Sequence, residues 1–212
     1  MLKPIVETDR LVSPSPEPHS IAVHGPDAWV ASRATRRIDV MSRYVWRKYD
    51  EIEPPGMPWG MNYGGGSLVM TCGEEDDNRR VRRYILGEGF DELVIEAPDD
   101  AGSHLALYGG RVLLGQWYNK RLLLLNDNGT VAQRWTTPHE ICGVAVIDDV
   151  AILLGTDDEE TEDYFITRLD LRTAAAEDLA RVPFRARGLA WDGSRFWTNH
   201  READRTVTFT LV

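Results

Sequence analysis

The sequence predicts an all-β fold, a five-bladed β-propeller with four-stranded blades, and two observations support this prediction. The first is a repeat, in which a strand, a tight turn and a second strand begin near residues 21, 61, 105, 144 and 189 of the 212-residue chain. The second is that a polar loop and a third apolar strand follow each of these hairpins. Repeats of about 40 residues that each hold four short strands are typical of propeller blades.

The turn between the first two strands of each repeat is built from residues that tolerate a positive φ. Such residues fit the tight turns of β-hairpins. The turns are Gly25-Pro26-Asp27, Gly64-Gly65-Gly66, Gly109-Gly110, Asp148-Asp149 and Asp192-Gly193. The sequence therefore predicts a short hairpin at the same place in every repeat.

The fourth strands decide where the blades begin and end. The first four repeats contain a further segment of strand character, whereas the fifth stops after three strands. Pairing of the N-terminal segment 4–12 with the last strand would close the ring and cover an exposed sheet edge. We expect one propeller domain over 1–212, with blades at about 19–52, 59–98, 102–136, 140–183 and 186–212 plus 4–12. The alternative for the same strands is an open all-β sandwich.

Helix content is expected to be minimal. Only residues 173–180, "TAAAEDLA", have marked helical propensity. Their place in the fourth repeat predicts a turn and a strand instead.

The net charge of −10 is concentrated in two loops. Residues 73–78 hold four acidic side chains and residues 156–163 hold six, while the other 24 acids balance the 24 Lys and Arg residues. Nucleic acid is not an expected partner, because its binding requires a basic patch. The acidic loops fit a cation, an amine or solubility alone.

Composition also bears on the compartment. The chain has no apolar run near the roughly 18 residues of a membrane span, and its start lacks the pattern of a signal peptide. Its two cysteines do not suggest a disulfide framework. We therefore expect a cytoplasmic protein that does not contact a membrane.

The propeller topology predicts where a functional site lies. The segments before the first strands and the loops between the second and third strands meet at one mouth of the channel, and loops on a rigid scaffold usually carry the site. Four of the five histidines fall in these segments. The predicted ligand-binding residues are His19, Trp59, Asn62, Trp117, Tyr118, His139, Arg187 and Asn199, and the predicted catalytic residues are His104, Glu140 and His200. A mouth of no special chemistry is the alternative.

Three kinds of chemistry fit this mouth. A divalent metal is the candidate cofactor, held by His104, His139, Glu140 and His200, and it would acidify a bound water as in hydrolases. A tuned histidine or Glu140 would serve acid–base chemistry without a metal. An aromatic and cationic pocket would bind a small polar molecule without transforming it. A scaffold for protein interactions is a further alternative, which predicts an apolar rim.

Two further stretches are "GLAWDGSRFWTNHREADRTVTF" (188–209) and "GGRVLLGQWYNKRLLLLND" (109–127), the latter with Trp117 after its second strand. They resemble one broad group of propellers, which contains the NHL repeats, the gluconolactonase-like proteins and the plant-type glutaminyl cyclotransferases. "EICG" (140–143) takes the place of the cyclotransferases' Glu-Gly-Trp-Gly, and Asn199 matches the Asn of their final blade. The resemblance implies a five-bladed propeller with acyl-transfer or metal-dependent lactonase chemistry. Ser103 of "AGSH" stands where the cyclotransferases carry their catalytic Glu.

Overall fold

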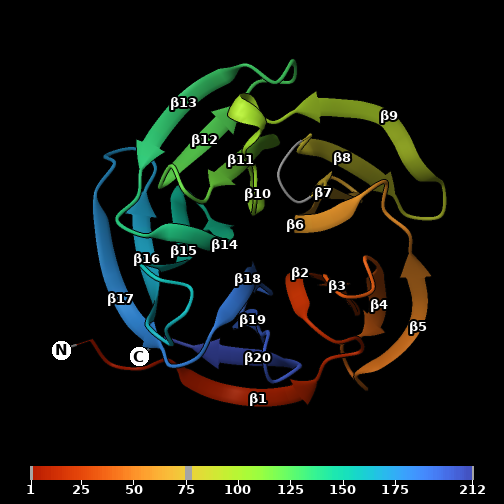
Figure 1. The fold of residues 1–212 in the computed structure, drawn as a ribbon, viewed down its shortest axis with the longest axis horizontal. Helices are drawn as coiled ribbons and strands as arrows, with labels where there is room; N and C mark the ends of the chain where they lie inside the picture. The colour runs from red at the N-terminus through yellow and green to blue at the C-terminus, as the bar shows by residue number, and fades with distance from the viewer. Residues whose placement is uncertain (1, 75–77, 212) are drawn as a thin grey trace.

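The computed structural model describes residues 2–74 and 78–211, so residues 75–77 of the acidic loop 73–78, and Val212, lie outside the described residues. Within these ranges the strands form five four-stranded antiparallel sheets around a central axis (Figure 1). This arrangement confirms the predicted five-bladed propeller. In that part of the chain the helical structure is a single 3₁₀ turn, η1 (Pro98–Asp100).

The strands of each blade follow one another from the axis outward. Blade one contains β2 (Pro18–His24), β3 (Asp27–Ser32), β4 (Ile38–Ser42) and β5 (Arg47–Ile52). Blade two contains β6 (Met57–Gly64), β7 (Ser67–Gly73), β8 (Arg80–Ile85) and β9 (Gly89–Glu96). Blade three contains β10 (Leu105–Tyr108), β11 (Arg111–Gln116), β12 (Arg121–Leu125) and β13 (Val131–Thr136). Blade four contains β14 (Glu140–Ile147), β15 (Val150–Thr156), β16 (Tyr164–Asp170) and β17 (Ala176–Val182). Blade five contains β18 (Ala186–Trp191), β19 (Phe196–His200), β20 (Arg205–Thr210) and β1 (Val6–Val12).

The N-terminal strand closes the ring, as the sequence predicted. β1 pairs antiparallel with β20, from Val6 opposite Thr210 to Val12 opposite Arg205 (Figure 1). The chain before β1 also joins blade four, because the Ile5 amide donates to the Arg181 carbonyl oxygen at 2.9 Å. The Ile5 side chain is buried among apolar residues of blades four and five. The last blade is thus completed from both ends of the chain.

Burial falls from the axis to the rim of each blade. Inner strands such as β3 and β18 are buried along nearly their whole length, whereas the outer strands β1 and β5 are mostly exposed. The buried apolar side chains gather between neighbouring blades, and each cluster combines two of them. Burial of a large apolar side chain contributes roughly 1.5–3 kcal/mol, so these interfaces hold the ring together.

The innermost strands approach each other closely, and glycine makes this possible. A Cβ at Gly60 of β6 would lie 2.5 Å from the Cα of His104, ahead of β10. Gly188 of β18 has a φ of +73° and lies against the backbone of Ser20 in β2. A side chain at either position would push two blades apart.

The predicted turns and the segment of helical propensity are found as expected. Positive φ occurs in the hairpin turns at Gly25, Gly65, Gly66, Gly109, Gly110, Asp148 and Gly193. Residues 173–180 form a turn and the first part of β17. No helix within residues 2–74 and 78–211 is long and apolar enough to cross a membrane.

Candidate functional site

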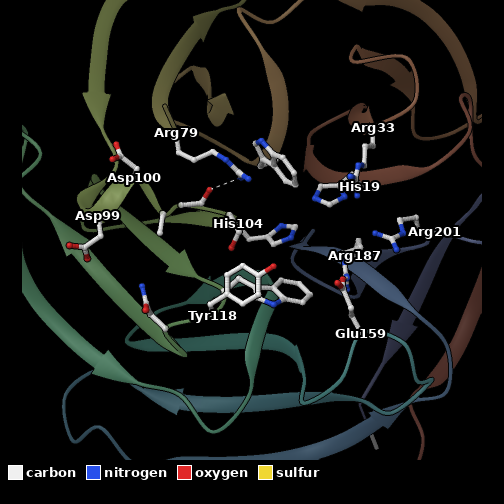
Figure 2. Close-up of a pocket in the computed structure, with 16 residues that line it drawn as sticks. His19, Arg33, Arg79, Asp99, Asp100, His104, Tyr118, Glu159, Arg187 and Arg201 are labelled. Carbon is white, nitrogen blue, oxygen red and sulfur yellow. Dashed lines mark hydrogen bonds and ion pairs between the residues drawn. The ribbon is translucent and has the colours of Figure 1, made fainter. Parts of the chain in front are cut away.

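A cavity of about 480 Å³ opens at the end of the channel where the inner strands begin. All five blades contribute to its lining, through the starts of first strands and the loops between second and third strands (Figure 2). Blade one contributes His19 and Arg33, blade two Trp59 and Arg79, blade three Ser103, His104, Trp117 and Tyr118, blade four Glu159, and blade five Arg187 and Arg201. We call this cavity the mouth pocket.

Two buried histidines face the mouth pocket side by side. His19 is 5% exposed and His104 is 3% exposed, and their rings stack with centroids 5.5 Å apart. The edge of Trp59 meets the His19 ring at 5.3 Å. The Nδ1 atom of His19 is buried and has no hydrogen-bond partner within the described ranges.

Both imidazoles are held neutral. Burial, followed by the charges of Arg187 and Arg79, lowers the pKa of His104 to about 3. Burial also lowers the pKa of His19 well below its usual 6.5, and His104 and Arg187 add to the effect. A neutral imidazole offers one N–H donor and one nitrogen acceptor, so the pair can donate hydrogen bonds to a neutral polar group and also accept them from it.

Arg187 is the buried cation beside these histidines. It is 2% exposed, and its guanidinium donates to the Tyr164 hydroxyl at 2.9 Å and to Glu159 Oε2 at 2.7 Å. It also lies over the Trp117 ring, 4.4 Å from the centroid. Although burial opposes it, the surrounding groups, Cys142 and Tyr164 foremost, raise the pKa of Arg187, which therefore stays charged.

The aromatic walls of the mouth pocket are also covered by arginines. The Arg79 guanidinium lies 3.5 Å from the centroid of Trp59 and donates to the Gly102 carbonyl oxygen at 3.1 Å (Figure 2). Arg33 approaches the same indole at 5.8 Å. The indoles are thereby fixed in place, since a cation over an aromatic face is attracted to it.

The structure brings together six of the residues predicted from the sequence. His19, Trp59, His104, Trp117, Tyr118 and Arg187 line the mouth pocket. Of the predicted catalytic set only His104 is among them, because Glu140 and His200 do not line it. Tyr118 is 86% exposed and lies at the rim.

Glu140 and His200 lie outside the mouth pocket. Burial raises the pKa of Glu140, while the charge of Lys120 and a hydrogen bond from Trp117 lower it. The His200 ring stacks on Phe184 at 4.7 Å. Burial, then the Arg10 charge, lowers the pKa of His200.

The three remaining predicted residues also lie away from the mouth pocket. His139 stacks on Phe165 at 4.4 Å, with Asp157 and Asp178 at 3.0 and 3.1 Å from its two ring nitrogens. Asn199 is fully buried, and its Oδ1 accepts a hydrogen bond from Thr206 at 3.0 Å. Asn62 is partly buried on β6, beyond Trp59 along the strand.

The candidate metal ligands do not converge. Across residues 2–74 and 78–211, no group of three or more His, Cys, Asp and Glu side chains is arranged to hold a metal ion. Four of the six carboxylates of the 156–163 loop pair with the protein's own cations: Asp157 with Lys120, Glu159 with Arg187, Glu160 with Arg185 and Asp163 with Arg181. This pairing does not favour a cation site in the loop.

Neither the cysteines nor Ser103 form an activated nucleophile. Burial raises the pKa of Cys72 and of Cys142 to about 12, so both remain thiols. The Ser103 hydroxyl donates to the Gly115 carbonyl oxygen at 3.1 Å. Ser103 thus stabilises the start of blade three.

Apart from Arg187, sequence reasoning missed the charged residues of the lining. Arg33, Arg201 and Glu159 lie in loops that the repeat places at the mouth, but nothing in their spacing distinguishes them from other charges there. Arg79 follows the acidic loop directly, and Asp99 and Asp100 lie in η1. The one signal in the sequence was the density of arginine in "RATRR" and "NHREADR".

No protein-family model and no curated protein matches the sequence. Solved structures do match. Myxococcus xanthus glutaminyl cyclase aligns with a TM-score of 0.74 and 10% identity, over 99% of this chain and 98% of that one. Virginiamycin B lyase from Staphylococcus aureus aligns with a TM-score of 0.55 and 17% identity, over 94% and 68%. Kuenenia stuttgartiensis hydrazine synthase aligns with a TM-score of 0.57 and 12% identity, over 92% and 57%. At these identities the likeness concerns the fold, and it agrees with the propeller group that the sequence resembles.

Proposed function

We propose that this chain binds a small polar molecule in the mouth pocket, with His19 and His104 as its hydrogen-bonding floor and Trp59 and Trp117 as its walls. The observation that carries the proposal is the buried histidine pair, which lines a cavity while the Nδ1 of His19 has no partner in the described part of the chain. A buried polar atom left unsatisfied costs about 1–3 kcal/mol. A ligand whose polar group reached this nitrogen on binding would recover that free energy.

The size and composition of the cavity support the same function. At about 480 Å³ it falls in the range of roughly 300–1,000 Å³ that is usual for small-molecule pockets. Two indoles and two imidazoles supply apolar contact area together with a few polar atoms. Such a combination orients a ligand by hydrogen bonds and holds it by surface burial.

Binding fits the electrostatics of the floor better than proton transfer does. A general base works best when its pKa lies near the working pH. With a pKa of about 3, His104 is a weak base at neutral pH, although its neutral ring still donates and accepts hydrogen bonds. The proposal is therefore recognition of a ligand, and catalysis is not part of it.

The experiment is a screen of small polar molecules by thermal unfolding and calorimetry, with carboxylates, amides, amines and sugars as probes. The test variant is His104→Leu, which keeps the approximate volume and removes both ring nitrogens. The matched control is His24→Leu, because His24 is exposed at the other end of β2 and stacks on Tyr63.

We expect at least one class of probe to raise the melting temperature of the native chain and of His24→Leu, since a ligand that binds only the folded state stabilises it. The same probe should not stabilise His104→Leu. Failure of every class to bind the native chain, or undiminished binding by His104→Leu, would refute the proposed function.

A further inference from the structure

The mouth pocket is rich in arginine, although the chain as a whole is acidic. Four guanidinium groups line it in a protein of net charge −10. The acidic lining residues are Asp99, Asp100 and Glu159. Two of these carboxylates are already paired, Glu159 with Arg187 and Asp99 with Arg121, which does not line the pocket.

Arg201 stands out among the four arginines. Its side chain is half-buried and lies beside Arg187 and Glu159 (Figure 2). Its guanidinium makes no hydrogen bond or ion pair with another side chain or carbonyl within residues 2–74 and 78–211. Burial, and next the charge of Arg187, lowers the pKa of Arg201. The charges of Arg187, Arg201 and Arg33 likewise help to lower the pKa of His19. The arginine contributions to these two pKa shifts reflect the positive charges gathered on this side of the pocket, whereas the charge of Glu159 acts on Arg201 in the opposite direction.

A second cavity adjoins the same two arginines. It is lined by Arg33 and Arg201 together with Pro16, Glu17, Glu202 and Asp204. Arg33 and Arg201 therefore line both cavities.

We infer that the ligand is a small organic anion, whose negatively charged head binds Arg201 and Arg33 while its uncharged polar part reaches His19 and His104. This inference rests on the proposed function and adds the charge of the ligand to it. The planar guanidinium matches carboxylate and phosphate heads in a bidentate fashion, and such charge-assisted bonds are about twice as strong as neutral ones. The indole walls suit a carbon frame, which a bare inorganic anion lacks.

The test compares probes that share one frame and differ in charge. Benzoate, benzamide and benzamidine have nearly the same shape and carry a negative, zero and positive charge, and hexanoate, hexanamide and hexylamine repeat the series on an aliphatic frame. Phenyl phosphate distinguishes the two possible heads. Titration calorimetry on the full chain at low and at high salt gives each affinity.

In at least one frame the anion should bind about tenfold more tightly than the amide, and the cation more weakly still. High salt should weaken the binding of the anion only. Arg201→Gln should lower the anion's affinity about tenfold and the amide's by less than about twofold. The matched control is Arg37→Gln, because Arg37 pairs with Glu51 and lines neither cavity, and it should leave both affinities unchanged.

The possible failures separate the two proposals. If amides or cations bind as tightly as the anions, and His104→Leu abolishes that binding, the inferred charge is wrong and the proposed function stands. If Arg201→Gln weakens amide and anion equally, Arg201 does not recognise charge and the inference is overturned. If no probe of any charge binds, both proposals fail.

Discussion

The two ends of this propeller differ in what their loops do. At one end the hairpin turns are short, and glycine or aspartate at positive φ fixes their shape, as at Gly65 and Asp148. At the other end the loops are longer and place arginines, carboxylates and aromatic rings around a cavity. Backbone conformation therefore determines the loops at the first end, which we call the turn end. Side-chain contacts determine the loops at the second, which we call the pocket end.

This difference indicates which end of a propeller is suited to a functional site. A tight turn leaves few side chains that are able to meet across the axis, because its residues are selected for their backbone conformation. The longer loops are free of that requirement, and the rigid sheets hold them in register around one opening. The charge environments differ accordingly: buried neutral histidines lie at the pocket end, and the buried carboxylate of Asp192 lies at the turn end.

The largest expected effect comes from comparing two glycine substitutions in the β6–β7 hairpin. One tests the close packing of the inner strands and the other tests the geometry of the turn. Gly60→Ala at the pocket end places a Cβ against the backbone of His104, so we expect a loss of about 3 kcal/mol or more in the free energy of unfolding. Gly65→Ala at the turn end meets open space, and its φ of +59° should cost only about 1 kcal/mol. Urea unfolding of both variants measures the difference, and equal stabilities would contradict the close approach of the inner strands.

The next prediction concerns pH at the pocket end. The pKa of His104 is about 3 in the folded chain and near 6.5 when unfolded, so the unfolded state binds more protons and stability falls as the pH drops below 6.5. Between pH 7 and pH 5 this group alone should account for about 2 kcal/mol. The free energy of unfolding of His104→Leu, measured in urea, should therefore fall by about 2 kcal/mol less than that of the native chain between pH 7 and pH 5.

His24→Leu is the control for this measurement, because it removes a histidine from the turn end. Its unfolding is followed at the same pH values, so that the loss of the His104 imidazole is compared with the loss of an exposed histidine outside the mouth pocket. If His104→Leu retained the full pH dependence, the imidazole of His104 would not be buried in its neutral form.

The smallest expected effect lies at the turn end, in a different pH window. Although burial opposes it, hydrogen bonds from Trp197, Arg195 and Ser194 hold the pKa of Asp192 at about 2. The stability that this carboxylate contributes is complete above its unfolded pKa of about 3.9 and is lost as the pH falls towards 2. Asp192→Asn should thus lose less stability between pH 6 and pH 3 than the native chain, with no change in slope between pH 7 and pH 5. A changed slope above pH 5 would show that the two ends are not independent.

The fold was predictable because its determinants are local and recur. The turn residues appear once in each repeat, and the apolar strands that follow them are buried on both faces near the axis. Even the helical propensity of 173–180 is overridden in the way that the repeat predicts, because strand β17 pairs with β16. The missing strand of blade five was found for the same reason, since an unpaired sheet edge requires a partner.

The candidate site was predictable only in part. The repeat indicates which segments surround the mouth, and it places His19, His104 and Arg187 there. It does not indicate which side chains of those segments point inward, and His139 and His200 turn instead toward Phe165 and Phe184. That choice depends on the neighbours each ring packs against, which belong to other strands and other loops.

The sequence by itself therefore determined the number of blades, the closure of the ring and the end that carries the loops, because each follows from comparing the repeats along the chain. The tertiary structure alone decided the charge and protonation of the mouth pocket. Arg33, Arg79, Arg187 and Arg201 come from separate segments of the chain, and only folding brings them around His19 and His104. Burial then gives these charges their effect, because a group removed from water responds to its neighbours far more strongly than an exposed one does.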